Sequence, residues 1–137
     1  DVPHHLGLLG HSDADVVTHA LMDAMLGAAA LGDIGQHFPD RDPAYAGISS
    51  LVLLGHVTDL LRAHGWRVVN ADATILAQRP KLMPHLLQMR QNWSRTMGVP
   101  LDALSIKATT EEGLGFTGTE QGIAAHAVVL IEPLGTQ

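Results

Sequence analysis

Apolar residues recur every three or four positions in three stretches of the chain, and this spacing predicts three helices. The first covers about 13–31, the second 50–64, and the third about 84–98. A glycine stands at or just beyond the end of each stretch, as is typical where helices stop. Residues 1–12 hold a proline and two glycines, so we expect them to form a loop that leads into the first helix.

Elsewhere the apolar spacing changes to two, which predicts strands over 66–76 and 104–109. The core face of the first strand is predicted to carry four apolar residues, Val69, Ala71, Ala73 and Ile75. A last strand, 123–132, is apolar on both faces, so we expect it to be central in the sheet. The order helix, helix, strand, helix, strand, strand predicts an α/β (α+β) sandwich with the helices on one side of a sheet.

Composition narrows the class of protein. The chain has 137 residues, 46% of them hydrophobic, which is enough for the core of one domain. It has no run of about twenty apolar residues and no signal-peptide pattern, so we expect a soluble, cytosolic protein that does not enter a membrane. Because cysteine is absent, any metal must be held by histidine and carboxylate. A net charge of −6 with eight Lys and Arg argues against a nucleic-acid surface.

The entry to the first predicted helix is unusually rich in groups that bind ligands. Ser12 or Asp13 can cap the helix, and His11 and Ser12 would then stand where free backbone N–H groups favour an anion. A capping serine beside an exposed histidine explains the same residues almost as well. Both interpretations remain open from the residues alone.

Asp15, His19 and Asp23 follow at steps of four residues, so they should lie along one side of this helix. A metal could use such a stripe. The carboxylates could equally orient a metal-binding His19 from behind, or simply be solvated.

Three loops carry further candidate groups. The loop 33–42 is rich in aspartate and proline, which fits either a loop that carries function or a plain turn. Two cations in 79–81 precede a helix start and suit a phosphate or the edge of a base, although such residues are common on surfaces. The loop 109–115 offers hydroxyls, carboxylates and glycines, and it also fits a plain hairpin connection. Neither common nucleotide-binding glycine motif is present.

Taken together, five sequence blocks in order resemble the 2-C-methyl-D-erythritol 2,4-cyclodiphosphate synthase family of the non-mevalonate isoprenoid pathway. The blocks span nearly the whole chain: His11-Ser12-Asp13-Ala14-Asp15-Val16 with His19, Leu26 to Gly35, Phe38-Pro39-Asp40, Ala77 to Lys81, and Lys107 to Thr110 with Gly115-Phe116-Thr117-Gly118. The resemblance implies a single domain over 1–137, with a ferredoxin-like subunit and a mixed sheet. It also implies a homotrimer with active sites between subunits, and a lyase that cyclises 4-diphosphocytidyl-2-C-methyl-D-erythritol 2-phosphate and releases CMP.

The resemblance assigns roles to individual residues. His11 and Thr110 match residues that support the phosphoryl transition state. His19 would be a ligand of Zn²⁺ or another divalent transition metal, and Glu112 would hold Mg²⁺ or Mn²⁺ at the α- and β-phosphates. The methylerythritol phosphate and ribose side would be lined by Ser12, Asp33, Ile34, Gly35, Phe38, Pro39, Asp40, Arg41, Asp42 and Phe116. The nucleotide would be held, from the adjacent subunit, by Ala77, Gln78, Arg79, Pro80, Lys81, Leu82, Met83 and Thr109.

The chain departs from the family pattern in three places. It begins after the family's opening Gly-x-Asp-Val-His strand, so we expect an N-terminally incomplete domain that binds zinc poorly through His19 alone. Thr119 stands where the family often has arginine, which weakens the case for an isoprenoid diphosphate on the trimer axis. Glu111 and Gly113 replace the usual threonine and lysine, which makes Glu111 a competitor of Glu112 as the metal ligand.

The sequence therefore supports two functions from different classes. The first is the synthase, located in the bacterial cytoplasm or in the plastid stroma after removal of a transit peptide. The second is a non-catalytic trimer that binds cytidine nucleotide or an isoprenoid phosphate.

Overall fold

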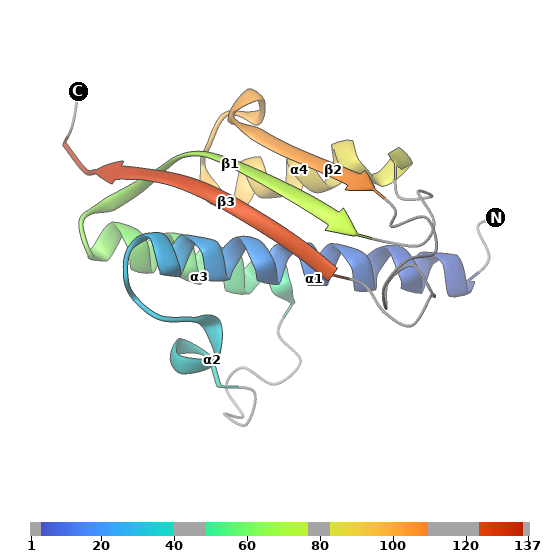
Figure 1. The fold of residues 1–137 in the computed structure, drawn as a ribbon, viewed down its shortest axis with the longest axis horizontal. Helices are drawn as coiled ribbons and strands as arrows, with labels where there is room; N and C mark the ends of the chain where they lie inside the picture. The colour runs from blue at the N-terminus through green and yellow to red at the C-terminus, as the bar shows by residue number, and fades with distance from the viewer. Residues whose placement is uncertain (1–3, 40–48, 77–82, 110–123, 136–137) are drawn as a thin grey trace.

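The computed structural model describes residues 4–39, 49–76, 83–109 and 124–135, with side chains from residue 14 in the first helix and from residue 85 in the last. Within these ranges the chain forms four α-helices, one short 3-10 helix and three strands (Figure 1). In chain order they are α1 (His4–Ala28), α2 (Ile34–His37), α3 (Ser50–Ala63), β1 (Trp66–Leu76), α4 (Met83–Met97), η1 (Leu101–Ala103), β2 (Leu104–Thr109) and β3 (Ala124–Pro133).

The three strands form one mixed sheet in the order β2-β1-β3. β1 runs parallel to β2, to which it is connected through α4, and antiparallel to β3. The long helices pack on one side of the sheet, with α1 against β3 and α4 against β2 (Figure 1). The predicted α/β sandwich is therefore confirmed. None of the described helices is both long and apolar enough to cross a bilayer.

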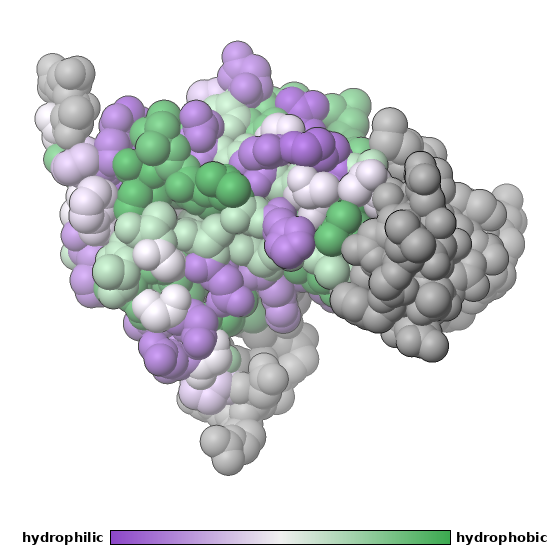
Figure 2. All heavy atoms as spheres, viewed as in Figure 1, coloured by the Kyte–Doolittle hydropathy of each residue, from purple (hydrophilic) through white to green (hydrophobic). Residues whose placement is uncertain are grey.

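The expectation that the last strand is central is wrong for the described sheet, where β3 lies at an edge. Its inner residues pack against the core, but on the outer face the side chains of Val128 and Leu130 are 73% and 54% exposed. The helices that the structure describes cover only one side of the sheet, and the second apolar face of β3 is exposed at Val128 and Leu130 (Figure 2). This outer face of β3, centred on Val128 and Leu130, is called the β3 outer face below.

The first helix begins nine residues earlier than predicted. α1 starts at His4, so most of the expected loop is helical, and Ser12 and Asp13 lie inside the helix. An N-cap residue must have non-helical backbone angles, so neither residue can cap this helix and His11 does not stand ahead of its first turn. The loop was predicted partly from Gly7 and Gly10. A glycine costs a helix only about 1 kcal/mol relative to alanine, so a helix can continue through both.

The same helix also ends three residues earlier than predicted, in a Schellman motif. The Leu31 N–H donates to Leu26 O at 2.8 Å, and the Ala30 N–H donates to Gly27 O at 3.0 Å. Ala30 adopts the left-handed backbone conformation that this motif requires, with φ of 57°. Glycine is the residue that usually fills this position, and Gly32, the predicted stop, lies two residues further on.

A β-bulge in β1 changes which valine enters the core. Val68 pairs with Ile131 and Asn70 pairs with Leu130, so the strand carries one extra residue between them. Val68 is consequently buried, whereas Val69, predicted to face the core, lies beside the outer face. Ala71, Ala73 and Ile75 are buried as predicted.

Candidate functional site

The exposed side of α1 carries Asp15, His19 and Asp23 in line, as predicted from their spacing. The helix buries Val17 and Leu21 on its other side, which leaves these three polar side chains facing away from the core. His19 is thus accessible to a ligand. The two aspartates beside it are engaged by neighbouring elements.

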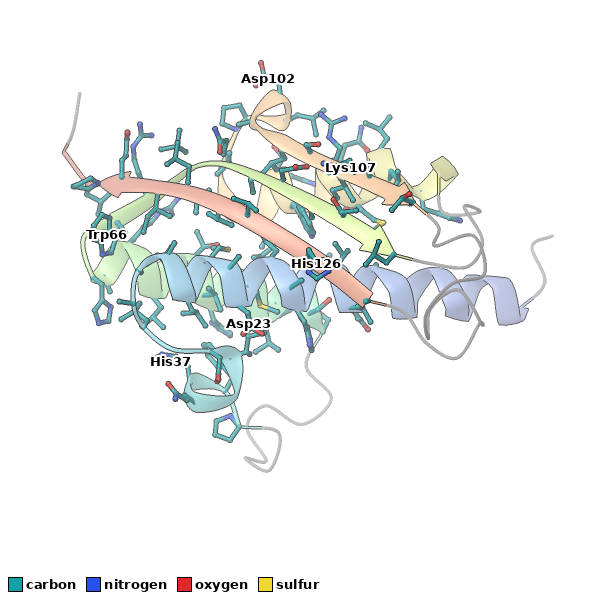
Figure 3. The ribbon with its side chains drawn as sticks, in the orientation of Figure 1. Asp23, His37, Trp66, Asp102, Lys107 and His126 are labelled. Carbon is teal, nitrogen blue, oxygen red and sulfur yellow. The ribbon has the colours of Figure 1, made fainter. Side chains whose placement is uncertain are left out.

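Asp23 binds the segment that follows α1. Its Oδ1 atom accepts a hydrogen bond from the backbone N–H of Ile34 at 2.9 Å, at the start of α2. Asp33 caps the same short helix, because its Oδ1 accepts from the Gln36 N–H at 3.0 Å. Figure 3 shows Asp23 on α1 next to α2. Three residues of the predicted substrate side, 33–35, are therefore fixed in position relative to His19.

Two further contacts hold the end of α2. The Nε2 atom of His37, the last residue of α2, lies 2.6 Å from Leu31 O in the connection between α1 and α2. The ring of Phe38 stacks on His56 of α3, with centroids 6.0 Å apart and planes inclined by 23°. A groove of about 360 Å³ beside this pair is lined by Phe38, His56, Asp59, Leu60 and Ala63. Phe38 was predicted from the sequence to lie on the substrate side, but its support from His56 was not.

Asp15 binds the start of α3. Its Oδ1 atom accepts a hydrogen bond from Ser50 Oγ at 2.6 Å, and Ser50 is buried. The preceding residue, Ser49, caps the helix through its own hydroxyl, which accepts from the Val52 N–H at 3.2 Å. Ser50 has no distinctive sequence signal, since a serine at a helix start is ordinarily explained by capping alone.

The ends of the three strands bring the other candidate segments together. Leu76, the last residue of β1, is paired with Thr109 at the end of β2 and with Ala124 at the start of β3. β1 and β2 therefore end at the same edge of the sheet, just before residues 77 and 110. In open α/β sheets this edge, beyond the carboxyl ends of parallel strands, is where ligands commonly bind.

Many of the predicted site residues lie outside the part of the chain that the structure describes. These are Asp40, Arg41, Asp42, Ala77, Gln78, Arg79, Pro80, Lys81, Leu82, Thr110, Glu112 and Phe116. For three others, His11, Ser12 and Met83, the backbone is helical and the side chains are not described. Of the other predicted site residues, Ile34 is attached to Asp23, one helical turn from His19, with Asp33 and Gly35 beside it in the chain and Phe38 and Pro39 just beyond.

Among the predicted site residues whose side chains the structure describes, His19 supplies an exposed imidazole for a metal. No group of three or more His, Cys, Asp or Glu capable of holding an ion occurs among the described residues. A zinc site uses three or four protein ligands, so His19 suits such a site chemically without completing it. Asp15 and Asp23 each commit one oxygen to another element, which reduces what they can offer to an ion.

Comparison with known proteins gives a consistent result. The YgbB family matches residues 1–132. A 2-C-methyl-D-erythritol 2,4-cyclodiphosphate synthase of Trichlorobacter lovleyi is 62% identical over 133 residues, which cover 97% of this chain and 85% of that protein.

The fold of this chain also resembles solved structures of such synthases. The bifunctional IspDF of Campylobacter jejuni is similar with a TM-score of 0.82 and 38% identity, over 87% of this chain and 32% of that chain. A CDP-bound 2C-methyl-D-erythritol-2,4-cyclodiphosphate synthase matches with a TM-score of 0.74 and 39% identity, over 84% of this chain and 74% of that chain.

Proposed function

The chain belongs to the YgbB family, and we propose that it catalyses the reaction of the synthases that it matches. It converts 4-diphosphocytidyl-2-C-methyl-D-erythritol 2-phosphate into 2-C-methyl-D-erythritol 2,4-cyclodiphosphate and releases CMP. The observation that carries this conclusion is the 62% identity to a synthase of that name over 97% of the chain. The likeness to a CDP-bound synthase structure agrees with a cytidine diphosphate substrate.

The reaction needs no redox step and no nucleophile from the protein. An oxygen of the 2-phosphate attacks the β-phosphorus and forms a new P–O bond. The bond from that phosphorus to the oxygen shared with the α-phosphate breaks, and CMP leaves with this oxygen. The task of the protein is to hold the two phosphates in line and to stabilise their charge, for which fixed geometry is worth several orders of magnitude in rate.

The described residues supply the positioning on the methylerythritol side. Residues 33–35 are held through Asp23 and the Asp33 cap, and Phe38 stacks on His56. We assign the substrate-side contacts to these residues and to the following 39–42, with Ser12 and Phe116. His11 and Thr110 are assigned to the transferring phosphoryl group. This assignment rests on the family motifs and on the attachment of Ile34 to Asp23, one helical turn from His19.

The charge of three phosphates requires counter-charge, which a protein of net charge −6 must gather locally. We assign Zn²⁺, or another divalent transition metal, to His19, together with ligands beyond those that the structure describes. A second ion, Mg²⁺ or Mn²⁺, is assigned to Glu112. When bound, such ions polarise phosphoryl oxygens and neutralise their charge. The acidic composition and the accessibility of His19 support this assignment.

The nucleotide side is assigned to 77–83 and Thr109 of an adjacent subunit in a homotrimer of ferredoxin-like subunits. Two observations support this arrangement. β1 and β2 end at one edge of the sheet, just before residues 77 and 110. The apolar residues of the β3 outer face are exposed in the single chain that the structure describes. The bacterial relative supports a cytoplasmic location in a bacterium.

Release of CMP tests the proposed function directly. The full-length protein, loaded with Zn²⁺ and Mg²⁺, should convert the diphosphocytidyl substrate into CMP and the cyclic diphosphate, as measured by chromatography and phosphorus NMR. His19→Ala should abolish the reaction. Binding of CDP without any CMP release would instead establish the non-catalytic cytidine-binding protein.

A further inference from the structure

Asp15 and Asp23 are placed symmetrically about His19 on α1, one helical turn to either side. Four residues of helix rise by about 6 Å, so each carboxylate stands roughly that far along the axis from the histidine. Each carboxylate accepts a hydrogen bond from another element through its Oδ1 atom. Asp23 receives the Ile34 N–H at 2.9 Å, and Asp15 receives the Ser50 hydroxyl at 2.6 Å.

The two hydrogen-bond donors, Ile34 and Ser50, each stand at the start of a helix. Ile34 is the first residue of α2, and Ser50 is the first residue of α3. The part of the chain between them contains most of the residues assigned to the methylerythritol phosphate. Both ends of this part are thus attached to the same face of α1, with His19 between the two points of attachment.

Both attachments are specific contacts. The Ile34 N–H lies at a helix start, where backbone N–H groups have no partner within the helix and require an outside acceptor. Asp33 satisfies the Gln36 N–H of the same turn, which leaves Asp23 to accept from Ile34. Ser50 is 8% exposed, so removing its acceptor would leave a nearly buried hydroxyl without that partner.

We propose that Asp15 and Asp23 are positioning residues, which attach the two ends of 34–50 to α1 on either side of His19. They thereby set the distance between the groups that hold the substrate and the metal that His19 holds. This inference rests on the proposed function for its catalytic consequence, while the attachment itself rests on the hydrogen bonds. It differs from a role in which the aspartates orient the imidazole of His19.

The test uses Asp23→Ala and Asp23→Asn in the full chain, with Asp102→Ala as the matched control. Asp102 is an exposed aspartate of η1, away from α1 (Figure 3). Hydrogen exchange of the Ile34 amide reports the attachment, zinc titration reports the metal site, and steady-state kinetics report KM and kcat. Thermal melting of each variant confirms that it folds.

In Asp23→Ala we expect exchange of the Ile34 amide to accelerate about threefold to tenfold, the range of one hydrogen bond. KM for the diphosphocytidyl substrate should rise, or kcat should fall, by a similar factor, while zinc affinity stays within about twofold of the wild type. Asp23→Asn retains an acceptor oxygen and should recover much of the loss. Asp15→Ala and Asp15→Asn should behave in the same way in the kinetic assay.

Three outcomes would overturn the inference. One is Ile34 exchange unchanged in Asp23→Ala, and another is zinc affinity lost along with activity. The third is faster exchange with unaltered kinetics. If the wild type releases no CMP, the proposed function fails, whereas the attachment is still decided by the exchange of Ile34.

Discussion

At the scale of single residues, the indole of Trp93 is a polar group buried in the core. Its side chain is 1% exposed, and its Nε1–H donates to the hydroxyl of Thr18 at 3.1 Å. Thr18 is itself buried and donates to Ala14 O at 2.6 Å. One hydroxyl therefore satisfies the indole and joins α4 to α1 across the core.

Thr18→Val should destabilise the protein by about 1–3 kcal/mol, because the buried indole N–H loses its acceptor while the volume is conserved. Urea unfolding at one protein concentration measures the change. Thr58→Val is the matched control, since the buried Thr58 hydroxyl donates to Leu54 O and accepts no hydrogen bond that the structure describes. Equal losses in the two variants would contradict this account of Trp93.

On the outer side of the sheet, Asp72 and Lys107 form an ion pair in which Nζ lies 2.7 Å from both carboxylate oxygens. The hydrogen bond from Lys107 lowers the pKa of Asp72 below its ordinary value of 3.8. Desolvation raises this pKa, and a hydrogen bond with Ser105 lowers it further. Because the folded pKa is lowered, this carboxylate stabilises the fold above its ordinary pKa. That contribution is lost as the pH falls through the lowered value.

Lys107→Met should therefore raise the pKa of Asp72, which NMR titration of its carboxyl carbon measures. The side chains of the pair are about half exposed, so its contribution near neutral pH should be only about 0.2–1 kcal/mol. The stability difference between the two proteins should vanish once the pH is below the lowered pKa. An unchanged titration midpoint would show that Lys107 does not cause the shift.

At the scale of elements, the C-terminus of α1 contains a residue poorly suited to its conformation. Ala30 has φ of 57°, where a Cβ atom costs about 1–2 kcal/mol. Ala30→Gly removes this strain, and the greater freedom of glycine in the unfolded chain offsets part of the gain.

We expect Ala30→Gly to stabilise the protein by about 0.5–1 kcal/mol in urea unfolding. Ala28→Gly, at an exposed position within the helix, should instead destabilise it by up to about 1 kcal/mol. If both variants lose stability, the Schellman geometry does not determine where this helix ends.

The same elements show what apolar spacing can and cannot predict. α3 and α4 were predicted because residues such as Leu54 and Trp93 recur at the helical period and are buried. The bulge in β1 was invisible, since Val68 and Val69 are equally suited to the core and only the pairing with β3 selects between them. The start of α1 was missed because cap-forming residues stand inside a helix that continues through them.

At the scale of the whole molecule, the sequence predicted which segments carry the candidate site but not how they are held. The line of Asp15, His19 and Asp23 follows from helical periodicity alone. The partners of the two aspartates, Ser50 and Ile34, lie 35 and 11 residues away, so only the packing of α2 and α3 against α1 reveals them. Family motifs predict which groups bind, whereas the residues proposed to position those groups leave no local pattern.

The uncovered side of the sheet bears on assembly. Asp72, Lys107 and the neighbouring strand residues give β1 and β2 a polar outer surface, while Val128 and Leu130 give β3 an apolar one. Exposed apolar side chains that are contiguous on a strand favour contact with another chain. In the proposed homotrimer, a neighbouring subunit would cover the β3 outer face.

We therefore expect the wild type to sediment at about three times the 14.6 kDa of one chain, and Val128→Lys with Leu130→Lys to sediment near the mass of one chain. Because lysine at either position would have to be buried unpaired, contact between subunits should become unfavourable while each subunit keeps its helical circular dichroism. CMP release should be lost together with the trimer, since the proposed site takes residues from two subunits. Val52→Lys, on the exposed side of α3, should leave both mass and activity unchanged. A wild type that sediments as one chain and still releases CMP would show that a single subunit holds the whole site.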